Sequence, residues 1–284
     1  MRPIQETTVL VTGATDGLGR GVASRLAAGG ATVHLHGRDA ERLGTTAQAI
    51  ERSTGNARIH THLADFAALD QVRALAADVQ RSTVQLHVLI NNAGIGSGRP
   101  EKTTRQESAD GYELRFAVNY LAGFLLTLRL VPLLRRSAPA RIINVASLGQ
   151  RPIDFDDVML SRNYSGTRAY SQSKLAQITS GFYLADRLAP DRITVNSLHP
   201  ATLMPTKIVL EQAGHSIDSL EEGIEATLRL ATSRELESTT GRFFDRATEA
   251  RAHDQAYDAD ARRRLWRLSL ELTGEPDELA VPVH

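Results

Sequence analysis

The chain has 284 residues, of which 42% are hydrophobic, and it carries 33 basic and 33 acidic side chains. This length suits one large α/β domain, and the balanced, scattered charge predicts no binding to nucleic acid or to an anionic membrane. No cysteine is present, which excludes disulfides, thiolate metal sites and thiol nucleophiles. The start of the chain lacks the pattern of a secretory signal, and no run of about 18 apolar residues is expected, so we expect a cytoplasmic protein.

Apolar, β-branched segments alternate with amphipathic segments of helical length along the whole chain. Seven of them are expected to be strands, at 8–11, 31–35, 58–63, 88–90, 141–145, 193–198 and 242–244. Helical segments between most of them require crossover connections. This predicts an α/β fold of the Rossmann type, with a doubly wound, mostly parallel seven-stranded sheet and helices on both faces. Ligands bind such a sheet beyond the carboxyl ends of its strands.

The first expected strand runs into a glycine-rich turn that a helix follows immediately. Its sequence is Thr12-Gly13-Ala14-Thr15-Asp16-Gly17-Leu18-Gly19. Glycines permit a tight turn and let the backbone approach a pyrophosphate, which then binds the free N–H groups of the helix N-terminus. An ordinary strand-to-helix turn is the alternative. The place of the turn in the first βαβ unit favours dinucleotide binding.

Tyr170 and Lys174 lie four residues apart, so one helical turn places them on the same face. A phenol titrates near pH ~10 in water and exchanges protons poorly at neutrality unless a nearby cation stabilises its phenolate. Lys174 can be this cation. Such a pair alone is most often a solvated helix surface, but downstream of a nucleotide loop it indicates a redox enzyme.

The spacing T-G-x-x-x-G-x-G of the loop, together with Tyr170 and Lys174, resembles the short-chain dehydrogenase/reductase family in its single-domain form. The resemblance covers about residues 7 to 246. Further motif matches are Asn91-Asn92-Ala93-Gly94, Asn119, Ser147 and His199-Pro200, in the family's order. The long connection between Ser147 and Tyr170, the sequence around Tyr170 and the run 265–274 resemble the retinol-dehydrogenase-like branch.

The resemblance implies roles for four catalytic residues. Tyr170 would exchange a proton with the substrate oxygen while hydride moves between the nicotinamide and the carbonyl carbon. Lys174 would lower the pKa of Tyr170 and bind the nicotinamide ribose. Ser147 would hydrogen-bond the carbonyl oxygen, and Asn119 would hold a water beside Lys174. Taken singly, Ser147 reads equally well as a strand-end hydroxyl and Asn119 as a helix surface residue.

The end of the second expected strand bears on the choice of cofactor. Gly37 stands where a carboxylate would bind the ribose hydroxyls of NAD, and Arg38 follows it, so we expect NADP. Asp39 is expected to cap the next helix. NAD stays open, because Asp16 occupies a position that is often basic in relatives preferring NADP.

The resemblance also assigns further contacts to the cofactor. They involve Asp65, Phe66, Asn92, Ala93, Gly94, Tyr170, Lys174 and Pro200, with Thr202 and Thr206 competing for the nicotinamide carboxamide. For Asp65, a helix-capping role is the alternative. Pairs of strand histidines, His34 with His36 and His60 with His62, raise the question of a metal site, but their spacing is not that of known ligand sets and we expect none.

We expect one domain over residues 1–284. Lid segments near 150–168 and 202–220 would cover a mainly apolar pocket, and a helical tail would lie near 255–274. The expected substrate is a medium-sized, largely apolar small molecule that carries a carbonyl or an alcohol. A catalytically silent protein that senses redox state is the alternative. The resemblance implies a homodimer or homotetramer that pairs through the helices bearing Asn119 and Tyr170. The excess of arginine over lysine suggests a bacterial source and a role in secondary metabolism.

Overall fold

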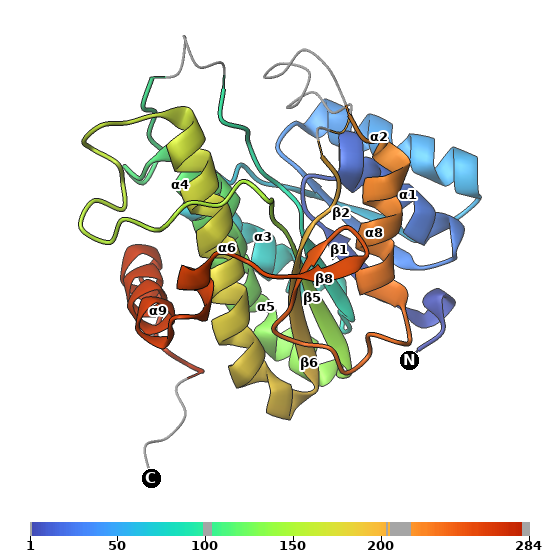
Figure 1. The fold of residues 1–284 in the computed structure, drawn as a ribbon. Coiled ribbons are helices and arrows are strands. Elements are labelled where there is room, and N and C mark those ends of the chain that lie inside the picture. Colours follow the sequence, from blue (N-terminus) through green and yellow to red (C-terminus); the bar gives the residue numbers. More distant parts are fainter. Residues whose placement is uncertain (1, 99–103, 203, 205–216, 280–284) are drawn as a thin grey trace.

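A computed structural model describes residues 2–98, 104–202, 204 and 217–279. Its described strands form one sheet in the order β3-β2-β1-β4-β5-β6-β7-β8 (Figure 1). The strands are β1 (Thr8–Val11), β2 (Thr32–Gly37), β3 (Ile59–Leu63), β4 (Val88–Asn91), β5 (Ala140–Val145), β6 (Ile193–His199), β7 (Phe243–Asp245) and β8 (Thr248–Ala250). All neighbours are parallel except β7 and β8. The order reverses between β1 and β4, and a doubly wound sheet binds its ligand at such a switch point.

The predicted fold class is confirmed, and the sheet has one strand more than the seven predicted. The additional strand β8 is a three-residue return of the chain after β7, joined to it by a turn in which Arg246 has a φ of 54°. Its sequence Thr-Glu-Ala has neither apolar alternation nor β-branched character throughout, so no pattern predicted it.

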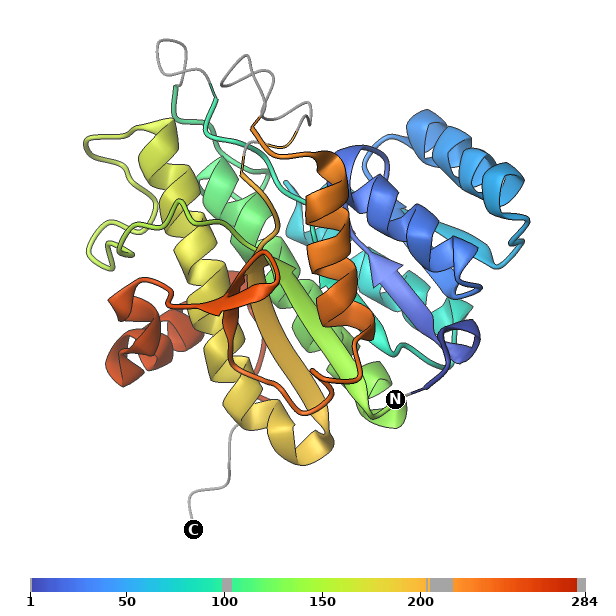
Figure 2. The ribbon, with the colours of Figure 1, turned by 45° about the vertical axis from the view of Figure 1, so that its right-hand side comes forward.

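Helices cover both faces of the sheet (Figure 2). One core cluster joins a face of the sheet to α1 (Gly17–Ala28), α2 (Ala40–Thr54) and α8 (Leu220–Thr232). The other joins the opposite face to α3 (Leu69–Ser82), α5 (Ala122–Arg136) and α6 (Gly166–Leu188). Short 3-10 turns are η1 (Ile4–Glu6), η4 (Ala189–Asp191) and η5 (Asp254–Tyr257). This is the layered α/β architecture that the alternation of segments predicts.

The continuous helix that ends in α5 is longer and more apolar than the sequence pattern suggests. It begins as α4 (Leu114–Phe116), continues through the π-helical turn η3 (Ala117–Leu121) and ends with α5. Over Leu114–Arg136 it meets the length and hydropathy of a membrane span, and 72% of its most apolar window is buried inside the structure. The expectation that no such run exists is therefore wrong. Packing against α3 and the sheet accounts for its hydrophobicity.

The C-terminal helix α9 (Ala259–Thr273) covers part of α5 and α6. Trp266 is fully buried there, with its ring centre 5.2 Å from that of Phe124 and 4.9 Å from that of Tyr183. The Ser269 and Tyr120 hydroxyls lie 2.6 Å apart. Part of the apolar surface of these helices is therefore covered within the same chain.

Candidate active site

The glycine-rich turn packs against the end of β4 through Thr12. Its hydroxyl donates to the Ile90 carbonyl (3.2 Å) and accepts from the backbone N–H groups of Asn92 (2.9 Å) and Ala93 (3.0 Å). The Asn92 side-chain amide donates in turn to the carbonyls of Thr12 (2.8 Å) and Gly13 (3.1 Å). The structure thus brings together two motifs that lie about eighty residues apart in the sequence.

Two glycines of the turn sit where no side chain fits. Gly13 has a φ of +65°, and a Cβ there would lie 2.8 Å from the Ala93 Cα. A Cβ on Gly19 would overlap the Gly13 carbonyl and the Asn92 amide. Gly17 also has a positive φ, and α1 begins at this residue with Asp16 as its cap and Leu18 buried. The close approach of backbone to backbone leaves a cradle that fits a dinucleotide pyrophosphate.

The end of β2 excludes a side chain as well. A Cβ on Gly37 would lie 2.6 Å from the Thr15 Cγ2, so a carboxylate there would require the Thr15 side chain to move. The Asp39 carboxylate caps α2 by accepting from the Arg42 N–H (3.0 Å), as predicted. Asp16 forms an ion pair with the Arg42 guanidinium (3.0 Å). Arg38 is exposed beside them.

His36 holds this region together, and the sequence interpretation missed it. Its Nδ1 accepts from the Gly13 N–H (3.3 Å), its Nε2 lies 3.0 Å from the Ala64 carbonyl, and its ring stacks on Phe66 at 4.4 Å. Burial lowers the pKa of His36 to about 4, which keeps the imidazole neutral as this pair of bonds requires. Four strand histidines looked alike in the sequence, so nothing marked this one.

Asp65 follows β3 and accepts a hydrogen bond from the Ala67 N–H (2.9 Å), while its own N–H donates to the Gln71 side chain (2.8 Å). The carboxylate therefore shapes the turn before α3. The residue that caps α3 is Ala68 and no side chain caps this helix, so the capping role weighed for Asp65 is wrong, and the predicted adenine contact stays untested.

Tyr170 and Lys174 lie on α6, whose first turn is capped by the Ser165 side chain. Lys174 is buried, and its ammonium donates to the carbonyl of Val145 (2.8 Å), the last residue of β5. Burial lowers the pKa of Lys174 to about 8. Ser147 follows two residues after Val145 and hydrogen-bonds Tyr170. The structure thus gathers all three side chains at the carboxyl end of β5.

Burial raises the pKa of the Tyr170 phenol, and the hydrogen bond with Ser147 lowers it. Lys174 Nζ lies 5.9 Å from the centre of the phenol ring and is directed at Val145. The predicted lowering of the Tyr170 pKa by Lys174 is therefore not seen in this geometry, because the ammonium is bound to a backbone carbonyl rather than to the phenol oxygen.

Asn119 lies in the π-helical turn η3, a local widening of the helix that often marks a functional site. Its Oδ1 accepts from the Ile95 N–H (2.7 Å), and its amide donates to the Ile95 carbonyl (3.1 Å) and the Ser173 hydroxyl (3.0 Å). A Cβ on Gly94 would lie 3.1 Å from Asn119 Oδ1 and 3.7 Å from Lys174 Nζ. Asn119 is buried, so it is not the helix surface residue of the alternative interpretation.

The residues after β6 form a polar cluster. Pro200 is buried, and the Thr202 hydroxyl lies 3.1 Å from His199 Nε2 and accepts from the Arg246 guanidinium (3.1 Å). The Thr202 N–H donates to Asp218 (2.6 Å). Thr202 is thus engaged within the protein, whereas Thr206, its competitor for the carboxamide, lies outside the described residues.

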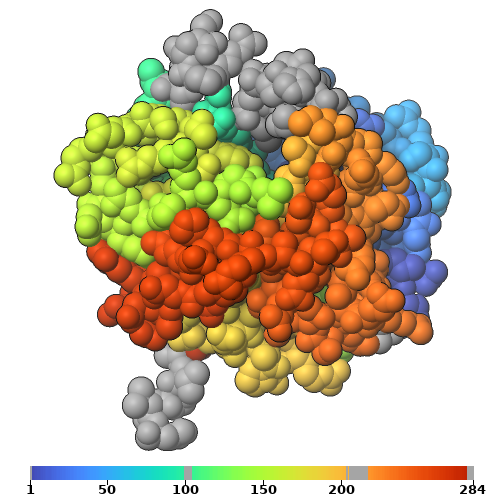
Figure 3. Space-filling view, in the orientation of Figure 1, coloured from blue at the N-terminus to red at the C-terminus, as the bar shows by residue number. Residues whose placement is uncertain are grey.

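The segment between Ser147 and Tyr170 is anchored along its length. Ile153 exchanges two hydrogen bonds with the Gln255 side chain (2.6 and 3.1 Å), and Gln150 accepts from the His253 N–H (2.7 Å). Figure 3 shows the surface of this segment lying beside that of the C-terminal residues. No sequence pattern predicted these contacts across about a hundred residues.

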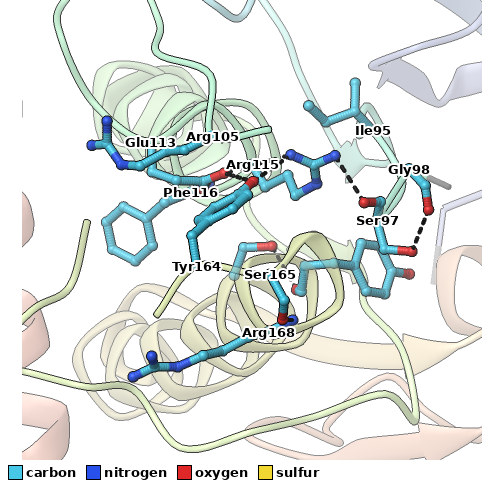
Figure 4. Close-up of polar contacts among 12 residues, drawn as sticks. Ile95, Ser97, Gly98, Arg105, Glu113, Arg115, Phe116, Tyr164, Ser165 and Arg168 are labelled. Carbon is cyan, nitrogen blue, oxygen red and sulfur yellow. Dashed lines mark hydrogen bonds and ion pairs between the residues drawn. The ribbon is translucent and has the colours of Figure 1, made fainter. Parts of the chain in front are cut away.

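A second polar group was also missed, on α4 and just before α6. Arg115, Glu113 and Tyr164 are joined by hydrogen bonds beside the segment that follows Gly94 (Figure 4). Over the described residues, no group of three or more histidine, aspartate or glutamate side chains is arranged to hold a metal ion.

Comparison with known proteins agrees with this geometry. The family model described as short chain dehydrogenase matches residues 7–214. Retinol dehydrogenase 13 of Mus musculus is 35% identical over 285 residues, covering 94% of this chain and 84% of the relative. Retinol dehydrogenase 11 of Homo sapiens is 35% identical over 283 residues, covering 94% and 86%.

Solved structures share the fold. A crystal structure of an uncharacterized protein from Mycobacterium paratuberculosis has a TM-score of 0.75 at 27% identity, covering 97% of this chain and 96% of the other. RhlG of Pseudomonas aeruginosa, solved with NADP in an active-site complex, has a TM-score of 0.70 at 26% identity, covering 86% and 97%. With the glycine cradle and the Tyr170, Lys174 and Ser147 group, these similarities establish that the chain belongs to the short-chain dehydrogenase/reductase family, in its retinol-dehydrogenase-like branch, as an NAD(P)-dependent oxidoreductase.

Proposed function

We propose that this enzyme interconverts a carbonyl and an alcohol on a medium-sized, largely apolar small molecule, with NADP(H) as its cofactor. The observation that carries the proposal is the meeting of Ser147, Tyr170 and Lys174 at the carboxyl end of β5. This end of the sheet also carries the glycine cradle after β1. A proton donor, a hydrogen-bonding hydroxyl and a buried cation are the groups that carbonyl reduction requires.

The nicotinamide, when bound, supplies or accepts the hydride. Tyr170 gives its proton to the substrate oxygen in reduction and takes one from the alcohol in oxidation. Ser147 donates a hydrogen bond to the same oxygen, where negative charge grows as the carbonyl is reduced. The buried Lys174 ammonium holds positive charge beside this pair, and Asn119 fixes the backbone at Ile95.

Contacts at the end of β2 support NADP. A Cβ on Gly37 would clash with the Thr15 side chain, Asp39 is used as a helix cap, and Asp16 is paired with the Arg42 guanidinium. Asp16 therefore opposes a 2′-phosphate less than its sequence position suggests. Arg38, which is exposed, offers a planar guanidinium that binds phosphate in two-pronged fashion.

The names of the relatives and the residues near Ser147 support the proposed substrate class. The two mammalian relatives are retinol dehydrogenases, which act on an apolar alcohol by name. Leu148, next to Ser147, is about half exposed in the structure (48%), so an apolar side chain borders the site. We propose that residues 150–168 shape the substrate side of the site.

Assembly and location are also proposals. We propose a homodimer or homotetramer that pairs through those parts of α5 and α6 that α9 leaves uncovered. We propose a cytoplasmic enzyme whose partners are its cofactor and a small molecule.

The test is a titration of the purified protein with NADPH and with NADH, followed by assays with medium-chain aldehydes, ketones and retinaldehyde. Binding of NADPH with turnover of at least one carbonyl compound would support the proposal. Tight binding of NADPH without turnover of any compound would favour the redox-sensing alternative, and binding of neither nucleotide would refute both.

A further inference from the structure

The chain after β4 is held on consecutive backbone groups by two side chains of one helix. Asn119 binds both the N–H and the carbonyl of Ile95. Arg115, one helical turn earlier, donates from Nε to the Gly96 carbonyl (2.8 Å) and from Nη2 to the Ser97 carbonyl (2.9 Å). The chain that follows Gly94 is therefore held in place at Ile95, Gly96 and Ser97.

Arg115 also reaches the segment that precedes the catalytic helix. Its Nη1 donates to the Tyr164 hydroxyl (2.7 Å), and this hydroxyl donates to a carboxylate oxygen of Glu113 (3.0 Å). Figure 4 shows Arg115 lying between Tyr164 and Ser97. Tyr164 directly precedes Ser165, the cap of α6. One guanidinium thus joins the chain after β4 to the start of the helix that carries Tyr170.

The burial of this group indicates that its geometry matters. The side chain of Arg115 is 7% exposed and that of Glu113 is 1% exposed, and their charged atoms lie 3.6 Å apart. Desolvation of two charges opposes folding, so a buried pair is weak as a source of stability and is retained where it fixes an arrangement. Burial and the neighbouring Glu113 raise the pKa of Tyr164 to about 12, so its hydroxyl keeps the proton that it donates.

The group of Arg115, Glu113 and Tyr164 joins two segments that lie near the catalytic residues. Ser147 and Tyr170 stand at the two ends of the segment that contains Tyr164, and both would bind the substrate oxygen. Residues 95–97 follow Gly94, at which a Cβ would lie 3.7 Å from Lys174 Nζ, so this stretch lies close to the catalytic group as well. A substrate with a long chain would extend from the catalytic group to these two stretches, and a short one would not.

We propose that Arg115 is a positioning residue that acts through Tyr164 to set the distance between these two walls of the substrate site, and thereby the preference for longer apolar substrates. The proposal rests on the proposed carbonyl reduction. It adds a residue that touches neither the cofactor cradle nor the Tyr170 hydroxyl and that acts on KM for long substrates.

The test compares Tyr164→Phe, which removes only the bridging hydroxyl, with wild type on a series of straight-chain aldehydes from propanal to decanal. Loss of the two hydrogen bonds of this hydroxyl, with Arg115 and with Glu113, predicts a KM for decanal that is roughly three- to tenfold higher, with kcat, the KM for propanal and NADPH affinity within about twofold of wild type. The control is Tyr112→Phe, which also removes a part-buried hydroxyl, one that donates a single bond to the Leu272 carbonyl of α9 (2.8 Å). The control should behave as wild type on both aldehydes.

A second variant, Arg115→Lys, keeps a positive charge beside Glu113 but loses the planar fork that spans three acceptors. It should fold and show the same selective rise in the KM for decanal. Equal KM changes for propanal and decanal in both variants, or no change in either, would overturn the proposal.

Hydrogen exchange separates a failure of this proposal from a failure of the proposed function. Peptides covering 94–98 and 148–165 should exchange faster in Tyr164→Phe than in wild type and in Tyr112→Phe, whether or not any aldehyde is reduced. Unchanged exchange would overturn the tether by itself. Faster exchange in a protein that reduces no aldehyde would refute the carbonyl reductase function and, with it, the effect on substrate length.

Discussion

Lys174 Nζ donates a 2.8 Å hydrogen bond to the carbonyl of Val145, two residues before Ser147. The Lys174 side chain of α6 thereby binds the end of β5, next to the Ser147 hydroxyl that hydrogen-bonds Tyr170. The bond satisfies one proton of a buried ammonium and fixes the cation at the substrate end of the sheet. The position of the charge is therefore built into the fold rather than left to a flexible side chain.

Burial of Lys174 has a consequence for stability against pH. The pKa of Lys174 is about 8 in the folded protein, against an ordinary value of 10.5 for lysine, so between these values the unfolded chain binds more protons and stability rises with pH. Replacement by methionine should remove this rise and increase the free energy of unfolding at pH 7 by roughly 1–3 kcal/mol. Urea unfolding of both proteins at pH 7, 9 and 10 measures it. A less stable Lys174→Met protein at pH 7 would contradict the account.

Below pH 6.5, the dependence of stability on pH is governed by buried histidines. Burial and then the neighbouring His62 lower the pKa of His34 to about 3, from the ordinary 6.5 of histidine. The unfolded chain therefore binds the proton first as pH falls below 6.5, and stability falls with it. His34→Leu should reduce the slope of stability between pH 6.5 and 4 by up to one proton, roughly 1.4 kcal/mol per pH unit. Parallel curves for the two proteins in urea unfolding would show that His34 is not the group concerned.

The close packing of the glycine turn after β1 predicts that one added methyl group strongly weakens cofactor binding. Gly19→Ala places a Cβ against the Gly13 carbonyl and the Asn92 amide, so the loop must shift and cofactor affinity should fall by roughly tenfold or more. Gly44→Ala is the matched control, because no atom lies within 4 Å of a Cβ there. It should leave affinity unchanged and stabilise α2 by roughly 0.5–1 kcal/mol. Equal NADPH affinity in both variants would refute the close approach of the loop.

The proposed preference for NADP is tested at Arg38. Arg38→Leu should weaken NADPH binding by about 10- to 100-fold through the loss of charge-assisted bonds to the 2′-phosphate, and should leave NADH binding within about twofold. Arg52→Leu, at the other end of α2, controls for the loss of a positive charge on this surface. Fluorescence titrations measure both. An equal loss for the two nucleotides would assign Arg38 to the adenine rather than to the phosphate.

Much of the fold follows from local patterns. Most of the strands β1 to β6 are apolar runs between amphipathic helices, whereas β3 (Ile59–Leu63) carries two histidines and a threonine and is partly exposed. The glycine turn marks the first crossover. β8 could not be predicted, because three residues are too few to show the alternation of apolar and polar side chains that marks a strand. The sequence also did not predict that Leu114–Arg136 is buried or that Trp266 packs on Tyr183, because both depend on which helices come into contact.

The site divides in the same way. Tyr170, Lys174, Ser147, Asn119 and the glycines stand in motifs with fixed spacing, so the sequence could name them. His36 looks like its neighbours His34 and His62, and only the contact with Gly13 sets it apart. Arg115 and Tyr164 are 49 residues apart and belong to no short motif, so their bond becomes visible only in three dimensions.

The most direct test of the catalytic assignment is NADPH-dependent carbonyl reduction by Tyr170→Phe, with Tyr183→Phe on the same helix as the control. Loss of the proton donor should lower kcat by roughly 10²- to 10⁴-fold while NADPH affinity and fold are kept, and the control should match wild type. Near-normal turnover by Tyr170→Phe would show that this phenol does not supply the proton and would contradict the account.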